Sequence, residues 1–83
     1  MVNVEQIKLR SQAAQRLLDD PLVMEILANL ENEHVERWRN AEAIGEREIA
    51  WHDLRAVHNF RARLVEVAHD YEVTRFNRKS RDM

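Results

Sequence analysis

The sequence contains no cysteine, and it has one glycine and one proline among its 83 residues. The absence of cysteine excludes disulfide bonds, zinc–thiolate sites and thiol catalysis. A single glycine and a single proline provide too few turns for a hairpin-rich β fold. They also exclude the glycine-rich loops that bind phosphates and dinucleotides. The sequence therefore predicts a small all-α domain without a cofactor.

Long apolar runs and an excess of one charge are also missing. No stretch approaches the roughly 18 apolar residues of a membrane span, and the opening segment MVNVEQIKLR has no apolar run typical of a signal peptide. The 13 basic and 15 acidic residues give a net charge of -2. A strongly basic nucleic-acid binder is therefore not the expected class, and no membrane partner is expected.

Capping residues and apolar spacing predict a first helix over about 4–18. Asn3 is its expected N-cap, and Gln6 has the position of the capping-box partner. One side of this helix carries a narrow stripe that steps by helical spacing. The stripe consists of Ile7, Ser11, Ala14 and Leu18. Because the stripe is thin, this helix is expected to dock weakly.

Asp20 and Pro21 predict the start of a second helix over about 21–43, since Asp suits the N-cap and Pro suits the first helical position. Gly45 is expected to end that helix in a left-handed conformation. A third helix is then expected over about 46–75. The short connection makes the second and third helices an antiparallel hairpin.

The main apolar side of the third helix is expected to pack against the second helix. The hairpin core is predicted to consist of Ile26, Leu27, Leu30, Trp38, Leu54, Val57, Phe60 and Leu64. Asp53 and Arg61 fall within the same side and need partners if they are buried. Arg37 and Glu33 of the second helix are the candidate partners.

A second apolar seam lies along another side of the third helix, and one neighbouring helix cannot cover both sides. It consists of Trp51, His58, Ala62, Val65, His69 and Phe76. The first helix is too short to cover a seam of about 45 Å. The seam therefore predicts a homo-oligomer or a protein partner in a larger assembly, and a monomer with scattered exposed apolar side chains is the alternative. The interface candidates are Trp51, His58, Val65 and His69.

The two tryptophans, Trp38 and Trp51, lie on either side of the predicted bend. They can pack together at the closed end of the hairpin, or they can mark an interface, where tryptophan is enriched. Core packing is the preferred interpretation.

Two Glu-x-x-His pairs, Glu31/His34 and Glu66/His69, have the spacing of ligands in di-iron carboxylate bundles. His34 lies on the apolar side of its helix, whereas Glu66 and His69 lie off the apolar side of theirs. The two pairs do not converge in a simple hairpin, so no metal site is predicted. The few serines and threonines lie outside any nucleophile elbow or oxyanion loop, and the sequence does not predict an enzyme.

The C-terminal segment is basic, and residues 77–83 are expected to form a disordered tail. The candidates for contact with nucleic acid are Arg75, Arg78, Lys79 and Arg81. These cations can neutralise phosphates, and Tyr71 and Phe76 can stack on bases. They can equally stabilise the C-terminus of a helix and keep a small protein in solution, which is the preferred interpretation.

The order of these features resembles small helical-hairpin proteins encoded in the head and packaging gene clusters of tailed bacteriophages and prophages. The resemblance covers roughly residues 17–72, although the connection near residue 45 is shorter than expected of that group. It rests on Asp20-Pro21, Leu30-Glu31, Trp38-Arg39, Glu46-Arg47-Glu48, Trp51, Leu54-Arg55-Ala56, Phe60-Arg61 and Leu64. No catalytic or ligand residue carries over from it.

That resemblance implies a non-enzymatic role in the assembly of a phage or prophage head, as a minor structural or accessory component. It places the protein in the bacterial cytoplasm or in the virion. The alternative that it implies is a small nucleic-acid-associated subunit, for DNA packaging or regulation, that uses the basic C-terminal tail.

Overall fold

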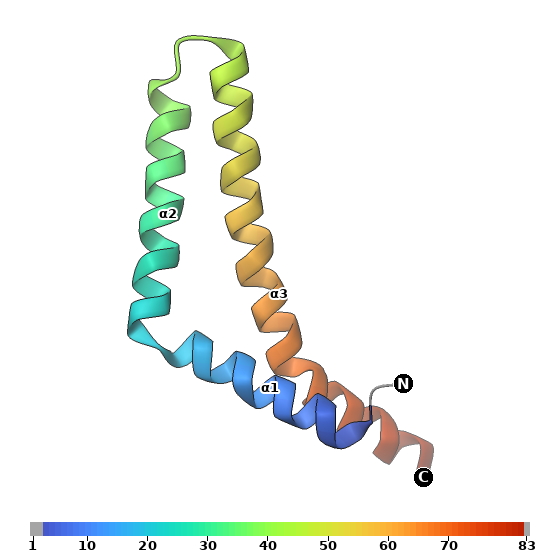
Figure 1. Cartoon of the computed structure of the whole chain (residues 1–83). Helices are drawn as coiled ribbons and strands as arrows, with labels where there is room; N and C mark the ends of the chain where they lie inside the picture. The colour runs from blue at the N-terminus through green and yellow to red at the C-terminus, as the bar shows by residue number, and fades with distance from the viewer. Residues whose placement is uncertain (1–2, 83) are drawn as a thin grey trace.

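The computed structural model describes residues 3–82, with side chains described for residues 3–77. It contains three α-helices: α1 spans Val4–Asp19, α2 spans Pro21–Asn40 and α3 spans Ile44–Asp82. α2 and α3 form a long antiparallel hairpin, and α1 packs against the far half of α3 (Figure 1). The molecule is elongated, with extents of 59 × 25 × 21 Å. The predicted all-α architecture with a helical hairpin is confirmed.

The starts of α1 and α2 follow the predicted capping residues. Asn3 Oδ1 accepts the backbone N–H of Gln6 at 2.8 Å, and Gln6 Oε1 accepts the N–H of Asn3 at 3.3 Å, which completes a capping box. Asp20 Oδ1 accepts the N–H of Leu22 at 2.9 Å, and Pro21 occupies the first position of α2. Asp20 alone separates α1 from α2, so the two helices meet at a sharp corner (Figure 1).

The connection between α2 and α3 differs from the prediction. α2 ends at Asn40 rather than near residue 43, and Gly45 lies inside the first turn of α3 without a positive φ. The prediction that Gly45 ends α2 is therefore wrong. The chain leaves α2 through extended backbone at Ala41, and the guanidinium of Arg47 donates to the Ala41 carbonyl at 3.3 Å. This side-chain hydrogen bond satisfies a carbonyl beyond the end of α2 without a left-handed residue.

The C-terminal end of α3 also differs from the prediction. α3 ends at Asp82, so its predicted end near residue 75 is wrong, and residues 77–82 are helical where a disordered tail is expected. No glycine or proline follows Gly45, so the sequence contains no strong helix breaker in this part. Met83 lies outside the described residues.

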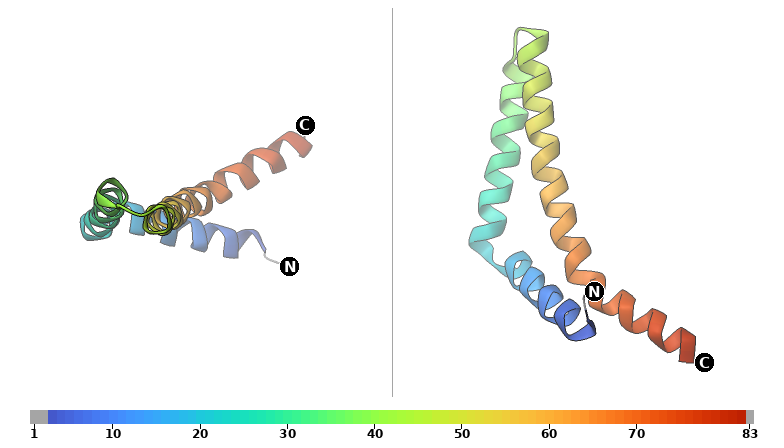
Figure 2. Two further views of the ribbon diagram at one scale, coloured as in Figure 1. Left: turned by 90° about the horizontal axis from the view of Figure 1, so that it is seen from above. Right: turned by 45° about the vertical axis from the view of Figure 1, so that its right-hand side comes forward.

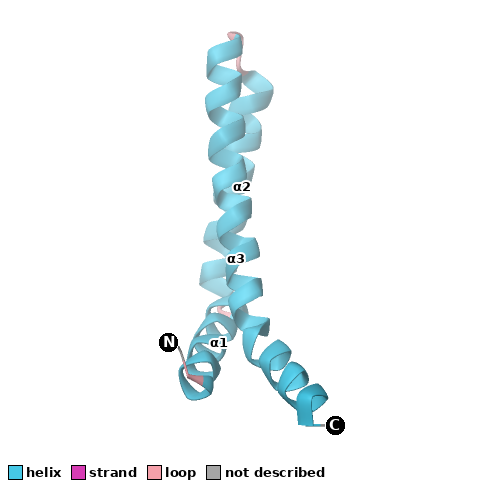
Figure 3. Ribbon diagram, turned by 90° about the vertical axis from the view of Figure 1, so that its right-hand side faces the viewer, coloured by secondary structure: helices cyan, strands magenta, loops and turns pink. Residues whose placement is uncertain are grey.

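Ser11 joins α1 to the backbone of α3. Its buried hydroxyl donates to the carbonyl oxygen of Val67 at 2.8 Å and accepts the N–H of Tyr71 at 3.0 Å. A regular α-helix would pair those two backbone groups with each other, since they are four residues apart. A side chain inserted into this ladder bends a helix. α3 turns away from the hairpin axis at the level where α1 lies against it (Figures 2 and 3).

Replacing Ser11 with alanine is expected to lower the free energy of unfolding by about 1–2 kcal/mol, because both backbone groups lose their buried partner. The effect is limited because α3 can restore the direct bond between Val67 and Tyr71. Chemical denaturation followed by circular dichroism measures the change. Ser11→Thr keeps the hydroxyl and is the matched comparison. Equal stability of the alanine variant and the wild type would contradict this role.

The interior of a single chain is small. No large side chain is fully buried among the described residues, and three of the four buried apolar residues are alanines. They are Ala14, Leu27, Ala41 and Ala50. The predicted stripe of α1 is confirmed as its inner side, with Ser11 and Ala14 buried and Ile7 and Leu18 half-buried. The helices therefore approach each other closely but enclose little apolar volume.

Part of the predicted hairpin core lies at the surface. Leu27 is buried, and the remaining correctly placed members, Leu30, Leu54, Val57 and Leu64, are half-buried. Ile26, Trp38 and Phe60 are 49%, 44% and 56% exposed, so their assignment to the core of one chain is wrong. Two helices bury only the strip along which they touch, and side chains beside that strip need a third helix to cover them.

The two tryptophans are also exposed, so the preferred interpretation of core packing at the closed end is wrong. Each indole ring instead lies under an arginine. The guanidinium carbon of Arg47 is 5.6 Å from the Trp38 ring centre, and that of Arg55 is 5.3 Å from the Trp51 ring centre. These cation–π contacts shield part of each ring from water.

Candidate protein interaction surface

α3 presents apolar side chains on two opposite sides. Phe60 and Trp51 are nine positions apart, which places them about 180° apart around a helix with 100° per residue. We call the side that carries Phe60, with the neighbouring parts of α1 and α2, the Phe60 face. We call the opposite side of α3 the Trp51 face. The two faces differ in shape and in charge.

The Phe60 face contains a groove of about 430 Å³ between α2 and α3. Every residue that lines it is apolar, and the lining consists of Val23, Ile26, Leu27, Leu30, Ala56, Val57 and Phe60. Exposed Ile26 and Phe60 stand at its edges. A polar group that entered this groove would lose its hydration without gaining a hydrogen bond. The groove therefore favours an apolar ligand group.

A second groove of about 280 Å³ continues the Phe60 face between α1 and α3. It is lined by Arg10, Ala13, Ala14, Leu17, Phe60, Arg63, Leu64 and Val67. Phe60 lines both grooves, so its ring is the ridge between them. The apolar strip therefore runs from α2 across α3 to α1, with two arginines along the second groove.

The Trp51 face holds all four interface candidates predicted from the sequence. Trp51, His58, Val65 and His69 are exposed on one side of α3. Phe76 extends the same side toward the C-terminus and is also exposed. The structure thus places the second seam together and leaves it open to solvent, as the spacing predicts.

Charged groups border the Trp51 face. Glu31 of α2 places Oε1 2.9 Å from Nη2 of Arg61 and Oε2 3.8 Å from Nε2 of His58. Glu33 is the candidate partner for Arg61 from the sequence, but the structure pairs Arg61 with Glu31. Glu31 Oε1 and Arg61 Nε are buried without an aligned hydrogen bond among the described residues. This pair would lose further hydration if the face were covered.

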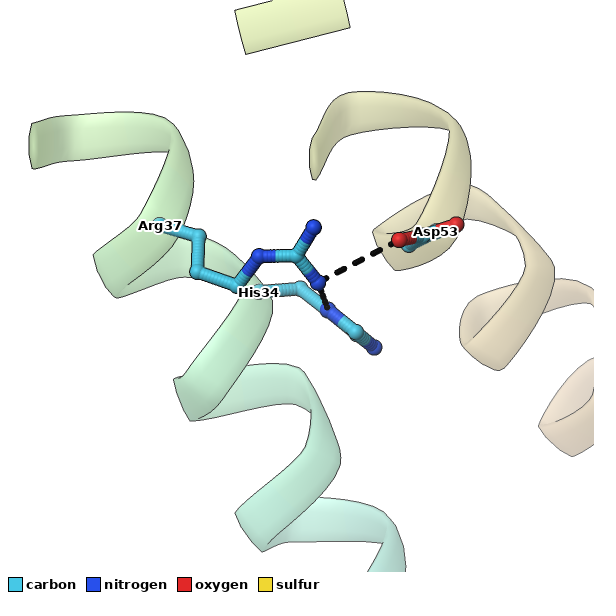
Figure 4. A network of polar contacts seen from close by, with 3 residues as sticks. All are labelled: His34, Arg37 and Asp53. Atoms are coloured by element: carbon cyan, nitrogen blue, oxygen red, sulfur yellow. Dashed lines mark hydrogen bonds and ion pairs between the residues drawn. The ribbon is translucent and has the colours of Figure 1, made fainter. Parts of the chain in front are cut away.

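The predicted pairing of Asp53 with Arg37 is confirmed. Arg37 Nη1 lies 3.3 Å from Asp53 Oδ2 and 3.2 Å from Nδ1 of His34, so one guanidinium links α2 to α3 (Figure 4). Both side chains of the ion pair are about half exposed, so the pair contributes at most about 1 kcal/mol. The pair joins α2 to α3 near the closed end of the hairpin.

The two Glu-x-x-His pairs do not meet. Glu31 and His34 contact arginines of the hairpin, whereas Glu66 pairs with Arg63 at 3.0 Å. His69 lies on the exposed side of α3. In the part of the chain that the structure describes, no three side chains of His, Cys, Asp or Glu gather as metal ligands.

The basic C-terminal part of α3 is described only in part. The guanidinium of Arg75 lies 5.8 Å from the ring centre of Tyr71, and the ammonium of Lys8 lies 5.9 Å from the same ring. Tyr71 is therefore already occupied by two cations of its own chain. The other three nucleic-acid candidates, Arg78, Lys79 and Arg81, have side chains outside the described set.

The chain matches no protein-family model, no curated protein and no solved structure. Within residues 3–82, no helix has the length and apolar content needed to cross a membrane. The Phe60 face is the most distinctive feature of the surface. The larger groove carries a signal in the sequence, because most of the residues that line it belong to the predicted hairpin core. Spacing alone does not reveal that the chain leaves them uncovered.

Proposed function

We propose that this chain is a non-enzymatic assembly protein that acts through protein–protein contact. The observation that carries the proposal is the small hydrophobic core of the single chain. No large side chain is fully buried among the described residues, whereas Ile26, Ile49 and Phe60 are exposed. Apolar surface of this extent favours association, because burial removes it from water.

The total surface supports the same proposal. The chain exposes 6800 Å², whereas a compact monomer of 9.9 kDa exposes about 5,200 Å². Its radius of gyration is 17.6 Å, compared with about 12 Å for a compact domain of this length. The single chain is therefore less compact than a typical monomer of its size, as expected of a subunit that buries part of its surface against a partner.

In its more specific form, the proposal assigns the chain to the assembly of a phage or prophage head. The support for this is the resemblance to small hairpin proteins of head and packaging gene clusters over residues 17–72. A narrow helical rod with an open apolar side suits a minor structural or accessory component. Such a component contacts larger subunits and performs no chemistry itself.

The test is to induce the prophages of the source organism and to purify both the particles and their assembly intermediates. Quantitative mass spectrometry is expected to find this chain in one of these fractions at a fixed ratio to the major head protein. An abundant cytosolic protein of similar mass serves as the contamination control. A chain found at the level of that control in every fraction would refute the role in head assembly.

A further inference from the structure

We propose that the Phe60 face binds the Phe60 face of a second copy of this chain, so that two hairpins form a four-helix bundle related by a two-fold axis. This inference rests on the proposed function, because it names the partner for the protein–protein contact. The proposal commits to one face and one occupant. Three properties of the face support it: its area, its shape and the placement of its charges.

The surplus surface has the size that a stable pair requires. The difference between 6800 Å² and the roughly 5,200 Å² of a compact monomer is about 1,600 Å² for each chain. That surplus is spread over the whole elongated chain. If the Phe60 face accounts for about half of it, two copies together bury about 1,600 Å², the standard size of a specific protein–protein interface. A smaller ligand would leave most of this surface exposed.

The shape of the face is self-complementary. A two-fold interface uses the same patch on both copies, so the patch must contain both a ridge and a recess. The exposed ring of Phe60 is the ridge, and the apolar grooves of about 430 and 280 Å³ beside it are the recesses. When two such faces meet, the ring of each copy enters a groove of the other, as knobs enter holes in four-helix bundles.

The charges around the Phe60 face are arranged as a rim. Toward the closed end of the hairpin Arg37 pairs with Asp53, and along the second groove Arg63 pairs with Glu66. The centre of the face is apolar, and its paired charges can remain in contact with water, which is the usual anatomy of an interface. Arg10 also lines the second groove. Burial of the first groove, which has no polar lining residue, therefore requires little desolvation of charge.

The Trp51 face is less suited to this contact. A partner bound to this face would desolvate the charged group formed by Glu31, His58 and Arg61. It would also desolvate Arg55, which lies above Trp51. Desolvation of charged groups opposes association unless the partner supplies matching groups. Glu31 and Arg61 already pair with each other within one chain, so covering them adds a desolvation cost without a new unpaired charge to satisfy. The Phe60 face is thus the better site for a homodimer.

The test measures absolute mass by size-exclusion chromatography with light scattering, with the full chain at several concentrations and at low and high salt. The wild type is expected at twice its chain mass of 9.9 kDa. Phe60→Glu places two like charges in the interface and is expected to raise the dissociation constant of the pair by about 100-fold or more. Val65→Glu introduces the same charge on the Trp51 face and is expected to leave the mass unchanged.

Crosslinking provides a second measurement that does not add a charge to the protein. Because the chain has no cysteine, Phe60→Cys and Val65→Cys each introduce a single thiol on one face. A short bis-maleimide is expected to join two copies efficiently through position 60 and poorly through position 65. This comparison decides the question if Phe60→Glu loses helical content by circular dichroism.

Three results would overturn the inference: a wild type of single-chain mass at every concentration, a Phe60→Glu variant that keeps the wild-type mass and fold, or dissociation caused by Val65→Glu alone. Preferential crosslinking through position 65 would also overturn it. The two proposals fail separately. A monomeric chain found in phage particles would refute the pairing and support head assembly, whereas a homodimer absent from particles would do the reverse.

Discussion

Replacing Leu27 with alanine is expected to lower the free energy of unfolding by about 2–5 kcal/mol, the range for removal of a buried leucine side chain. Leu27 is 5% exposed and is the one large apolar side chain among the buried residues described. A domain of this size has a total stability of only about 5–10 kcal/mol. The variant is therefore expected to be partly unfolded at physiological temperature.

Urea denaturation followed by circular dichroism at one fixed protein concentration measures this change. The concentration is held constant because association contributes to apparent stability. Leu22→Ala is the matched control, since Leu22 lies in the first turn of the same helix and is 60% exposed. We expect the control to change stability by less than about 1 kcal/mol. Equal losses in the two variants would show that Leu27 is not a core residue.

Replacing Ala50 with leucine is expected to destabilise the hairpin by about 1–3 kcal/mol, the usual cost of overpacking a close contact. Ala50 has 0% exposure and belongs to the second turn of α3. The first half of α3 runs beside α2 (Figure 1). An isobutyl group must fit there in place of a methyl group. The helices must separate locally to accommodate it, which also strains the contact between Arg37 and Asp53.

The same denaturation experiment tests Ala50→Leu, with Ala62→Leu as its control. Ala62 is exposed on the Trp51 face of the same helix, so the larger side chain extends into solvent. Because leucine and alanine are both strong helix formers, the control is expected to stay within about 0.5 kcal/mol of the wild type. A stable Ala50→Leu variant would show that α2 and α3 are not in close contact at this position.

Local signals in the sequence predict the starts of the helices well. Asn3, Asp20 and Pro21 act on backbone groups within three residues of themselves, so their effect does not depend on the rest of the fold. Near the end of α2, Arg47 reaches back from α3 to the carbonyl of Ala41. Spacing within one helix carries no information about a cap supplied by another helix.

Ion pairs between α2 and α3 are also predicted only in part from the sequence. The partner of Asp53 is predicted correctly, whereas Arg61 pairs with Glu31 rather than Glu33. The choice between two glutamates that point to different sides of α2 is made by the rotation of α2 against α3. That rotation is set by packing along the whole hairpin.

Apolar spacing predicts which side of a helix avoids water, but it does not identify what covers that side. Leu27 and Phe60 belong to the same predicted core, yet the first is buried and the second is exposed. The difference arises because one chain supplies only α2 and α1 as neighbours of α3. The hydrogen bonds of Ser11 with the backbone of α3 have no signal in the sequence beyond the position of Ser11 in an inward stripe.

The attachment of Ser11 to α3 sets an order of events in folding. Its two hydrogen bonds join positions 56 and 60 residues apart, whereas α2 and α3 meet across a connection of three residues, 41–43. Contacts between segments that are close in sequence form faster, because they close shorter loops. We therefore expect the hairpin to form first and α1 to dock afterwards. During synthesis α1 is made first, yet its docking site on α3 is not complete until residues 67–71 have been made.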